Sequence, residues 1–86
     1  MQIYLKRSFI KQYQKLQKNY RKKVDEAIKI FENNPRNPVL RNHTLVGKLL
    51  GKRSIAAGFD LRIVFEIEGD YVIVTMLAVG THNQVY

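Results

Sequence analysis

The chain contains no cysteine among its 86 residues, which excludes disulfides, thiolate metal sites and thiol nucleophiles and fits a reducing compartment. No apolar run approaches the roughly 20 residues that span a bilayer, and the N-terminal residues alternate in polarity instead of forming a signal-peptide core. Two histidines without i, i+4 spacing do not predict a metal site. We therefore expect a cytoplasmic protein with no membrane association and no metal or other cofactor.

Acidic residues are also scarce, at seven against 15 lysines and arginines, which gives a net charge of +8. Fourteen of the basic residues and only three of the acidic ones lie in residues 1–53. Such a cationic surface favours contact with nucleic acid or the ribosome. The alternative is a solvated basic face that only maintains solubility. A hydrophobic content of 45% predicts one globular domain over residues 1–86.

The hydrophobic spacing predicts a strand followed by a helical hairpin. Residues 2–6 alternate in polarity, which is typical of a strand. Two amphipathic helices then follow, the first capped by Ser8, with a break near residues 18–21 and an end at residues 32–38, "ENNPRNP". The residues expected on their buried faces are Phe9, Tyr13, Leu16 and Tyr20, then Val24, Ala27, Ile28 and Phe31.

The second half predicts strands after an irregular loop over residues 39–51. A weak strand, "RSIAAG", precedes a strong one, "LRIVFEI", and a third, "YVIVTMLAV", with a tight turn at Gly69-Asp70 joining the last two. The order β-α-α-β-β-β predicts an α+β fold in which a two-helix hairpin packs on a mainly antiparallel four-stranded sheet. In residues 61–67 the odd positions are apolar and should face the helices. Arg62 would then lie on the sheet face that no helix covers.

Two histidines and this arginine are the first candidates for chemistry. His43 and His82 can share general acid and general base work, because imidazole titrates near neutral pH. They can equally be surface or capping residues. The planar guanidinium of Arg62 suits a phosphate or a developing oxyanion. Its alternative role is a cross-strand ion pair with an acidic residue of the last two strands.

Four further residues have both a functional and a structural interpretation. Asp60 can orient a histidine or simply end the turn before its strand. Tyr86 can stack on a base or cover the edge of the core. Lys52 and Arg53 can reach an RNA backbone phosphate or remain solvated.

Residues 42–86 carry three short motifs in a distinctive order. They are His-x-Leu-x-Gly at 43–47, Asp-x-Arg at 60–62, and Gly-Thr-His at 80–82 followed by an aromatic residue at 86. This order and spacing resembles the RelE superfamily of bacterial toxins, and most closely its YafQ branch. The helical hairpin is similar to the family's N-terminal half, so the resemblance covers essentially the whole chain.

The resemblance implies a type II toxin that cuts mRNA in the ribosomal A site and is neutralised by a cognate antitoxin. It assigns His43, Asp60, His82 and Tyr86 to active-site positions of the YafQ branch, while Arg62 matches a catalytic arginine of RelE. The expected reaction is attack of a 2′-hydroxyl on the adjacent phosphate without a metal. His82 would be the acid, His43 or Asp60 the base, Arg62 the charge stabiliser and Tyr86 a stacking or positioning group.

Three positions depart from the YafQ pattern. Ala56 replaces a histidine, Leu61 a tryptophan and Ala78 an arginine of the last strand, and Arg62 is the candidate to replace that lost charge. Two other functions stay open. One is a ParE-like toxin that inhibits DNA gyrase without cutting RNA, and the other is a non-catalytic RNA- or ribosome-binding module. The paired histidines and the terminal aromatic residue favour the nuclease.

Overall fold

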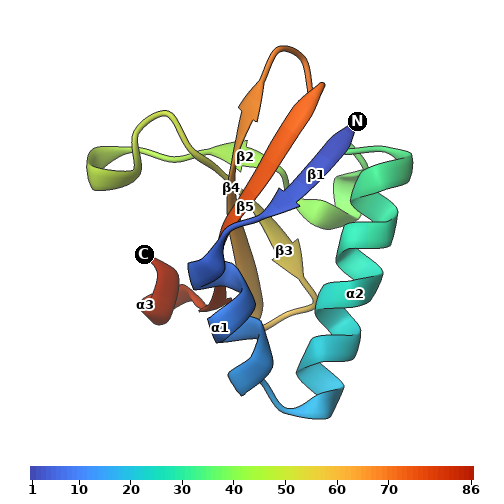
Figure 1. The fold of residues 1–86 in the computed structure, drawn as a ribbon, viewed down its shortest axis with the longest axis vertical. Coiled ribbons are helices and arrows are strands. Elements are labelled where there is room, and N and C mark those ends of the chain that lie inside the picture. Colours follow the sequence, from blue (N-terminus) through green and yellow to red (C-terminus); the bar gives the residue numbers. More distant parts are fainter.

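One sheet of five strands forms the centre of the computed structural model, which describes residues 1–86 (Figure 1). The strand order is β1-β5-β4-β3-β2; β1 runs parallel to β5, and the other neighbouring pairs are antiparallel. None of the helices has both the length and the apolar character required to cross a membrane. The elements in chain order are β1 (Gln2–Leu5), α1 (Arg7–Lys15), α2 (Lys18–Asn33), the 3₁₀ helix η1 (Pro38–Leu40), β2 (His43–Thr44), the 3₁₀ helix η2 (Gly47–Leu49), β3 (Arg53–Ala57), β4 (Leu61–Glu68), β5 (Ile73–Thr81) and α3 (His82–Val85).

The α+β class and the helical hairpin confirm the sequence prediction, but the sheet has five strands instead of four. The additional strand, β2, lies within the stretch predicted to be a loop and pairs with Ser54 and Arg53 of β3. Two residues are too few to produce a detectable alternation of polarity. Only the pairing with β3 therefore reveals this strand.

The break between the helices lies at Leu16 and Gln17, which are both extended, slightly before the predicted position. Arg21 Nη1 donates a hydrogen bond to the Leu16 carbonyl at 2.6 Å and fixes this corner. Tyr20 consequently belongs to α2 and not to the apolar stripe of the first helix. The end of α2 at Asn33 agrees with the predicted stop.

The helix α1 docks on β5 at a bulge, where Leu77 has no partner in β4. Ser8 Oγ donates to the Leu77 carbonyl at 2.6 Å, and the Gln12 side-chain oxygen accepts from the Val79 amide at 2.9 Å. The prediction that Ser8 caps the helix is therefore wrong. The N-cap is Lys6, which makes no side-chain capping bond, because the Ser8 hydroxyl is used across the interface with β5.

The connection between β4 and β5 is longer than the predicted tight turn, because β5 begins only at Ile73. Gly69 and Tyr71 both have positive φ, at 65° and 64°. Such a conformation is unfavourable for tyrosine, so tertiary contacts must hold it. The Tyr71 ring packs edge-on against Phe31 at 5.8 Å, and Asn42 Nδ2 donates to its hydroxyl at 2.9 Å.

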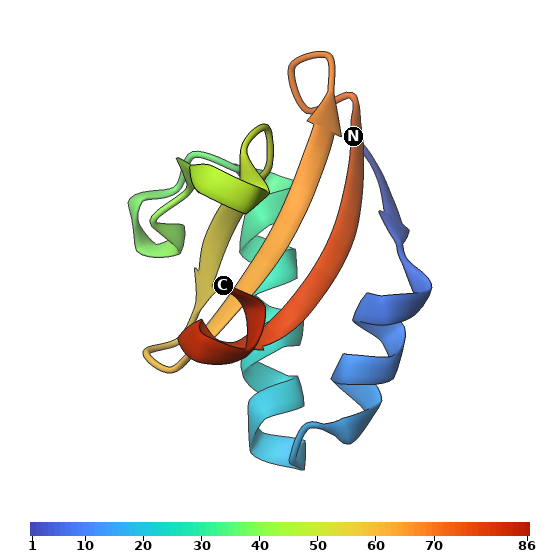
Figure 2. The ribbon, with the colours of Figure 1, turned by 90° about the vertical axis from the view of Figure 1, so that its left-hand side faces the viewer.

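The core lies between the sheet and the helical hairpin. Leu61, Ile63 and Phe65 of β4 are fully buried in it, as the alternation predicts. The opposite face, however, is not free of helices: α3 packs against β4 and β5 there (Figure 2). This one-turn helix has no sequence periodicity, which is why the prediction of an open face was wrong.

Candidate functional site

His43 lies on β2 with its side chain exposed, directly opposite Ser54 of β3. Its Nδ1 lies 2.7 Å from the carbonyl oxygen of Arg41, a residue with φ of 50° that ends η1. A carbonyl can only accept, so Nδ1 carries a proton, and the lone pair of this tautomer lies at Nε2. The backbone thus holds His43 in the tautomer that a general base requires.

His82 is the first residue of α3, Tyr86 directly follows the helix, and the two side chains contact each other. Their rings meet edge to face with centroids 4.6 Å apart. The Tyr86 hydroxyl donates to Ser54 Oγ, which is buried in β3. The two predicted histidines are therefore linked to one residue, since Ser54 pairs with His43 and bonds the aromatic neighbour of His82.

The position of α3 follows from the last residues of β5. Thr81 and Gln84 form a reciprocal capping box, in which Gln84 Oε1 accepts from the Thr81 amide at 2.8 Å. Gly80 lies beneath this turn, and a Cβ there would approach Gln84 Oε1 to 2.7 Å and Val85 Cγ1 to 3.4 Å. The glycine lets the helix pack directly on the strand.

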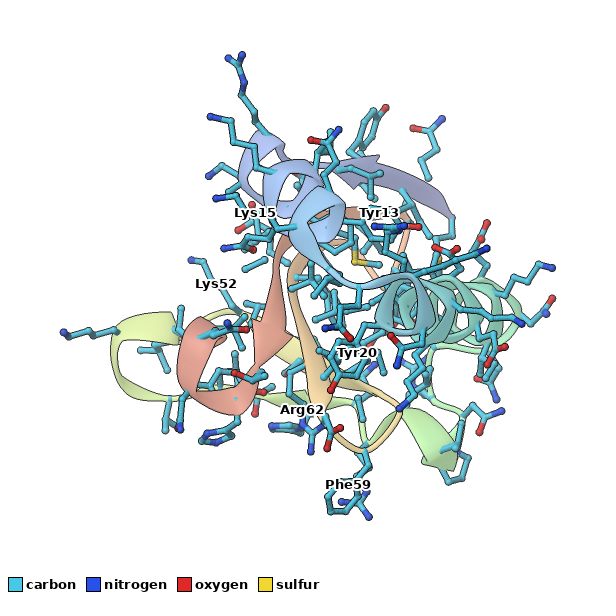
Figure 3. All side chains as sticks on the ribbon, turned by 90° about the horizontal axis from the view of Figure 1, so that it is seen from below. Tyr13, Lys15, Tyr20, Lys52, Phe59 and Arg62 are labelled. Atoms are coloured by element: carbon cyan, nitrogen blue, oxygen red, sulfur yellow. The ribbon has the colours of Figure 1, made fainter.

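Arg62 is half-buried on the α3 face of the sheet, where it pairs with Ala56 of β3 and Gly80 of β5. Its Nη1 donates to the carbonyls of Leu61 at 2.8 Å and Phe59 at 3.2 Å, and Nε and Nη2 make no hydrogen bond in the protein. Figure 3 shows Arg62 between α3 and Phe59. None of the cross-strand ion pairs considered as its alternative role is formed, because the chain's one salt bridge joins Arg36 to Asp70.

The other three predicted site residues, Asp60, Lys52 and Arg53, do not form one cluster. Asp60 is exposed in the β3–β4 turn and forms no ion pair with Arg62. Lys52 lies just before β3 and is half-buried. Arg53 instead alternates with Ser54 and faces the helix layer, where its Nε donates to Asn42 Oδ1 at 2.9 Å. The structure therefore does not place Arg53 beside the histidines.

A groove of about 1030 Å³ opens next to Arg62, between α2, η1 and the end of β3. Its rim exposes 89% of Phe59 and 63% of Val39. Three basic side chains and one acidic side chain accompany six hydrophobic residues in its lining. The charged residues are Lys23, Arg41, Arg62 and Glu26.

The sequence assigned no role to Ser54 or Phe59, and it identified Gly80 only as part of the Gly-Thr-His motif. Ser54 and Gly80 look like ordinary strand residues, and only the docking of α3 shows why a hydroxyl and a glycine are needed there. The sequence gives a weak indication for Phe59, because a large aromatic residue in a predicted turn is expected to be exposed and available for an interaction.

The comparisons with known proteins agree with this fold. A family model described as the ParE toxin of the type II toxin–antitoxin system parDE matches residues 3–86. No curated protein sequence matches the chain. Among solved structures, a copper-bound mutant toxin from Helicobacter pylori is 26% identical, with a TM-score of 0.78, over 100% of this chain and 99% of that one.

Two other structures share the fold at lower identity. YafQ from Escherichia coli is 19% identical with a TM-score of 0.81, over 98% of this chain and 96% of its own. The toxin–antitoxin complex RelBE2 from Mycobacterium tuberculosis is 18% identical with a TM-score of 0.65, over 94% and 96%. YafQ has also been solved in complex with DinJ. The predicted relationship to RelE-type toxins is thus confirmed, and the chain belongs to the ParE toxin family of type II toxin–antitoxin systems.

Proposed function

We propose that this toxin is a ribosome-dependent mRNA endonuclease that acts in the cytoplasm. The observation that carries the proposal is that Ser54 pairs with His43 and bonds Tyr86, the ring neighbour of His82, on the same sheet face as Arg62. Two imidazoles and a guanidinium on one face supply a base, an acid and a fixed positive charge. These are the three groups that RNA cleavage by its own 2′-hydroxyl requires.

In the proposed reaction, Nε2 of His43 takes the proton from the 2′-hydroxyl, because its Nδ1 proton is held by the Arg41 carbonyl. The 2′-oxygen then attacks the adjacent phosphorus, and the free donors of Arg62 stabilise the charge on the non-bridging oxygens. His82 donates a proton to the 5′-oxygen as the P–O5′ bond breaks. The products are a 2′,3′-cyclic phosphate and a 5′-hydroxyl, while Tyr86 positions His82.

Substrate geometry is left to the ribosome in this proposal. His43 and His82 are exposed at the protein surface instead of enclosed in a cleft, so in-line alignment of the 2′-oxygen depends on how the ribosome holds the codon. Free RNA is then a poor substrate. The positive charge of residues 1–53 favours binding to ribosomal RNA.

The test compares the wild type with His82→Ala in a translating extract, with cleavage sites mapped by primer extension. We expect cleavage at codon positions by the wild type and a loss of about 10²- to 10⁴-fold in the variant. Asn83→Ala, an exposed neighbour on the same turn, is the matched control and should cleave normally. Equal cleavage by wild type and His82→Ala would remove His82 from the mechanism.

Inhibition of DNA gyrase is the second candidate, and the match to the ParE family model favours it. It predicts that the wild type blocks gyrase supercoiling in vitro and leaves mRNA intact. Under this alternative His82→Ala remains toxic to growing cells, since no proton transfer is needed. The third alternative, an RNA- or ribosome-binding module, predicts salt-sensitive ribosome binding without growth arrest.

The proposed protein partner is a cognate antitoxin bound in the groove beside Arg62. An exposed apolar rim with Lys23 and Arg41 in the lining suits an amphipathic segment with acidic side chains. Such a segment would cover Arg62, which lines the same groove.

Phe59→Glu tests this site by adding repulsion at the rim. With the antitoxin from the neighbouring reading frame co-expressed, we expect the variant to escape neutralisation and arrest growth. Val72→Glu changes a residue that is 62% exposed in the distant β4–β5 connection and should remain neutralised. Equal neutralisation of both variants would exclude the groove.

A further inference from the structure

Ser54 is the one polar side chain that the fold buries completely, with no exposed surface. It lies on the face of β3 away from the main core, beneath α3. Its Oγ accepts a hydrogen bond from the hydroxyl of Tyr86, so the buried oxygen is paired. A buried hydroxyl in a strand is costly unless it is hydrogen-bonded, and this bond meets that requirement.

The position of Ser54 in the sheet brings it next to one predicted catalytic residue. It is the cross-strand partner of His43, and paired side chains on one face of an antiparallel ladder have Cβ atoms about 4.5–5.5 Å apart. β2 consists of only two residues, so this pairing is half of its register. Ser54 therefore lies where the short strand carrying His43 attaches to the sheet.

The bond to Tyr86 connects Ser54 to the other histidine. α3 is a four-residue helix, and an isolated helix of one turn is unstable without tertiary contacts. Tyr86 is 42% exposed, and the bond from its hydroxyl to Ser54 anchors the side chain to the sheet. That ring contacts the imidazole of His82 edge-on at 4.6 Å.

We propose that Ser54 is a positioning residue that sets the separation of His43 and His82. The Tyr86 ring contacts His82, and its hydroxyl bonds Ser54, which lies opposite His43 in the sheet. The expected effect on mRNA cleavage rests on the proposed nuclease function, whereas the contacts among Ser54, Tyr86 and His82 do not. The bond to Ser54 also gives the Tyr86 hydroxyl a role separate from base stacking.

The first test measures geometry without activity. Because the two rings meet edge to face, the Tyr86 ring current shifts the His82 ring protons in the NMR spectrum of the wild type. We expect Ser54→Ala and Tyr86→Phe to reduce this shift, since each removes one partner of the bond. Ser8→Ala, which removes a serine hydroxyl bonded to β5 on the face that the helical hairpin covers, should leave the shift unchanged.

The second test measures single-turnover cleavage of mRNA on purified ribosomes at saturating toxin. Each variant should lower the maximal rate about three- to tenfold, as expected for one hydrogen bond, with an unchanged half-saturating concentration. The double variant should be no slower than either single one, because both act through the same bond. Ser54→Thr keeps the hydroxyl and should recover part of the rate. Tyr86→Phe removes the same hydrogen bond but keeps the aromatic ring and Ser54. It therefore provides the test if Ser54→Ala folds poorly.

The outcomes separate the two proposals. An unchanged His82 shift in both Ser54→Ala and Tyr86→Phe overturns the positioning role, whatever the activity. A changed shift with a wild type that cuts no mRNA supports the positioning role and overturns the nuclease. Additive losses of rate in the double variant also overturn the role assigned to Ser54.

Discussion

The ring of Tyr86 lies edge-on against the imidazole of His82, with the ring centroids 4.6 Å apart and the planes at 82°. The two residues are four positions apart, so one turn of α3 places them on the same helix face. The contact gives His82 a fixed neighbour on one side and leaves its exposed side toward solvent. The orientation of the proposed acid therefore depends on the docking of α3.

Gly80→Ala should displace α3 from the sheet. The new Cβ would lie 2.7 Å from Gln84 Oε1 and 3.1 Å from Gln84 Cβ, and the Oε1 atom is already held by the Thr81 amide. We expect cleavage to fall at least tenfold, with a loss of about 1–3 kcal/mol in the free energy of unfolding. Codon-specific cleavage and urea unfolding measure the two effects.

Gly47→Ala is the control for a general loss of stability. Gly47 has φ of +67°, and no atom lies within 4 Å of the position that a methyl group would take, so alanine there is strained but meets no clash. It should lower stability by about 1–2 kcal/mol and leave cleavage intact. Equal cleavage by Gly80→Ala and Gly47→Ala would argue that the packing of α3 is irrelevant to activity.

Arg62→Ala should reduce the cleavage rate by about 10²- to 10³-fold, the usual cost of losing a group that stabilises transition-state charge. Arg62→Lys should retain part of the activity, because it keeps the charge but loses the planar fork. Arg36→Ala is the matched control, since this exposed arginine interacts with Asp70 and the Tyr71 ring at the far β4–β5 connection. If Arg62→Ala cuts as fast as Arg36→Ala, the phosphate role of Arg62 is wrong.

Phe31→Ala should destabilise the fold by about 3–5 kcal/mol, because it leaves a large cavity at the centre of the core. The Phe31 ring is fully buried and contacts the rings of Phe65 at 5.0 Å and Tyr71 at 5.8 Å. Phe59→Ala removes a ring that is 89% exposed and should change stability by less than about 0.5 kcal/mol. Urea unfolding followed by circular dichroism compares the two variants directly.

Tyr13→Phe should change how stability depends on pH. The hydrogen bond that Tyr13 donates to Asp25 Oδ1 at 2.6 Å, assisted by burial, raises the pKa of the phenol above its ordinary value of 10.0. A raised pKa for an acid favours the folded state while the phenol is protonated. The stabilisation is therefore complete below pH 10 and is lost as pH rises through the folded-state pKa.

The measurement is the unfolding midpoint of wild type and Tyr13→Phe between pH 7 and pH 11. The wild type should be the more stable protein at pH 7, and the difference should shrink in the alkaline range. A difference that stays constant up to pH 11 would contradict a role for the phenol proton.

Local sequence patterns determined much of the fold. The alternation in β4 placed Leu61, Ile63 and Phe65 in the core, and the apolar stripes placed the two helices on one face of the sheet. The same alternation put Arg62 on the opposite face. These predictions succeeded because each depends on a period that repeats over several residues.

The sequence identified only some of the residues that the structure places at the candidate site. His43, His82, Tyr86 and Arg62 were identified from chemistry and from the resemblance, and their roles stay predictions. Arg53 was predicted with Lys52 to reach an RNA backbone phosphate, yet strand alternation turns its side chain to the helix layer. Adjacency in sequence does not give a shared face in a strand.

By itself the sequence determined the helices, the long strands and the residue types available for chemistry, since these follow from local periodicity and composition. Only the tertiary structure decided that His43 pairs with Ser54, that Ser54 bonds Tyr86, and that α3 covers the second face. A two-residue strand and a one-turn helix have no stability of their own. They form because the finished sheet offers them a partner, so no local pattern in the chain encodes them.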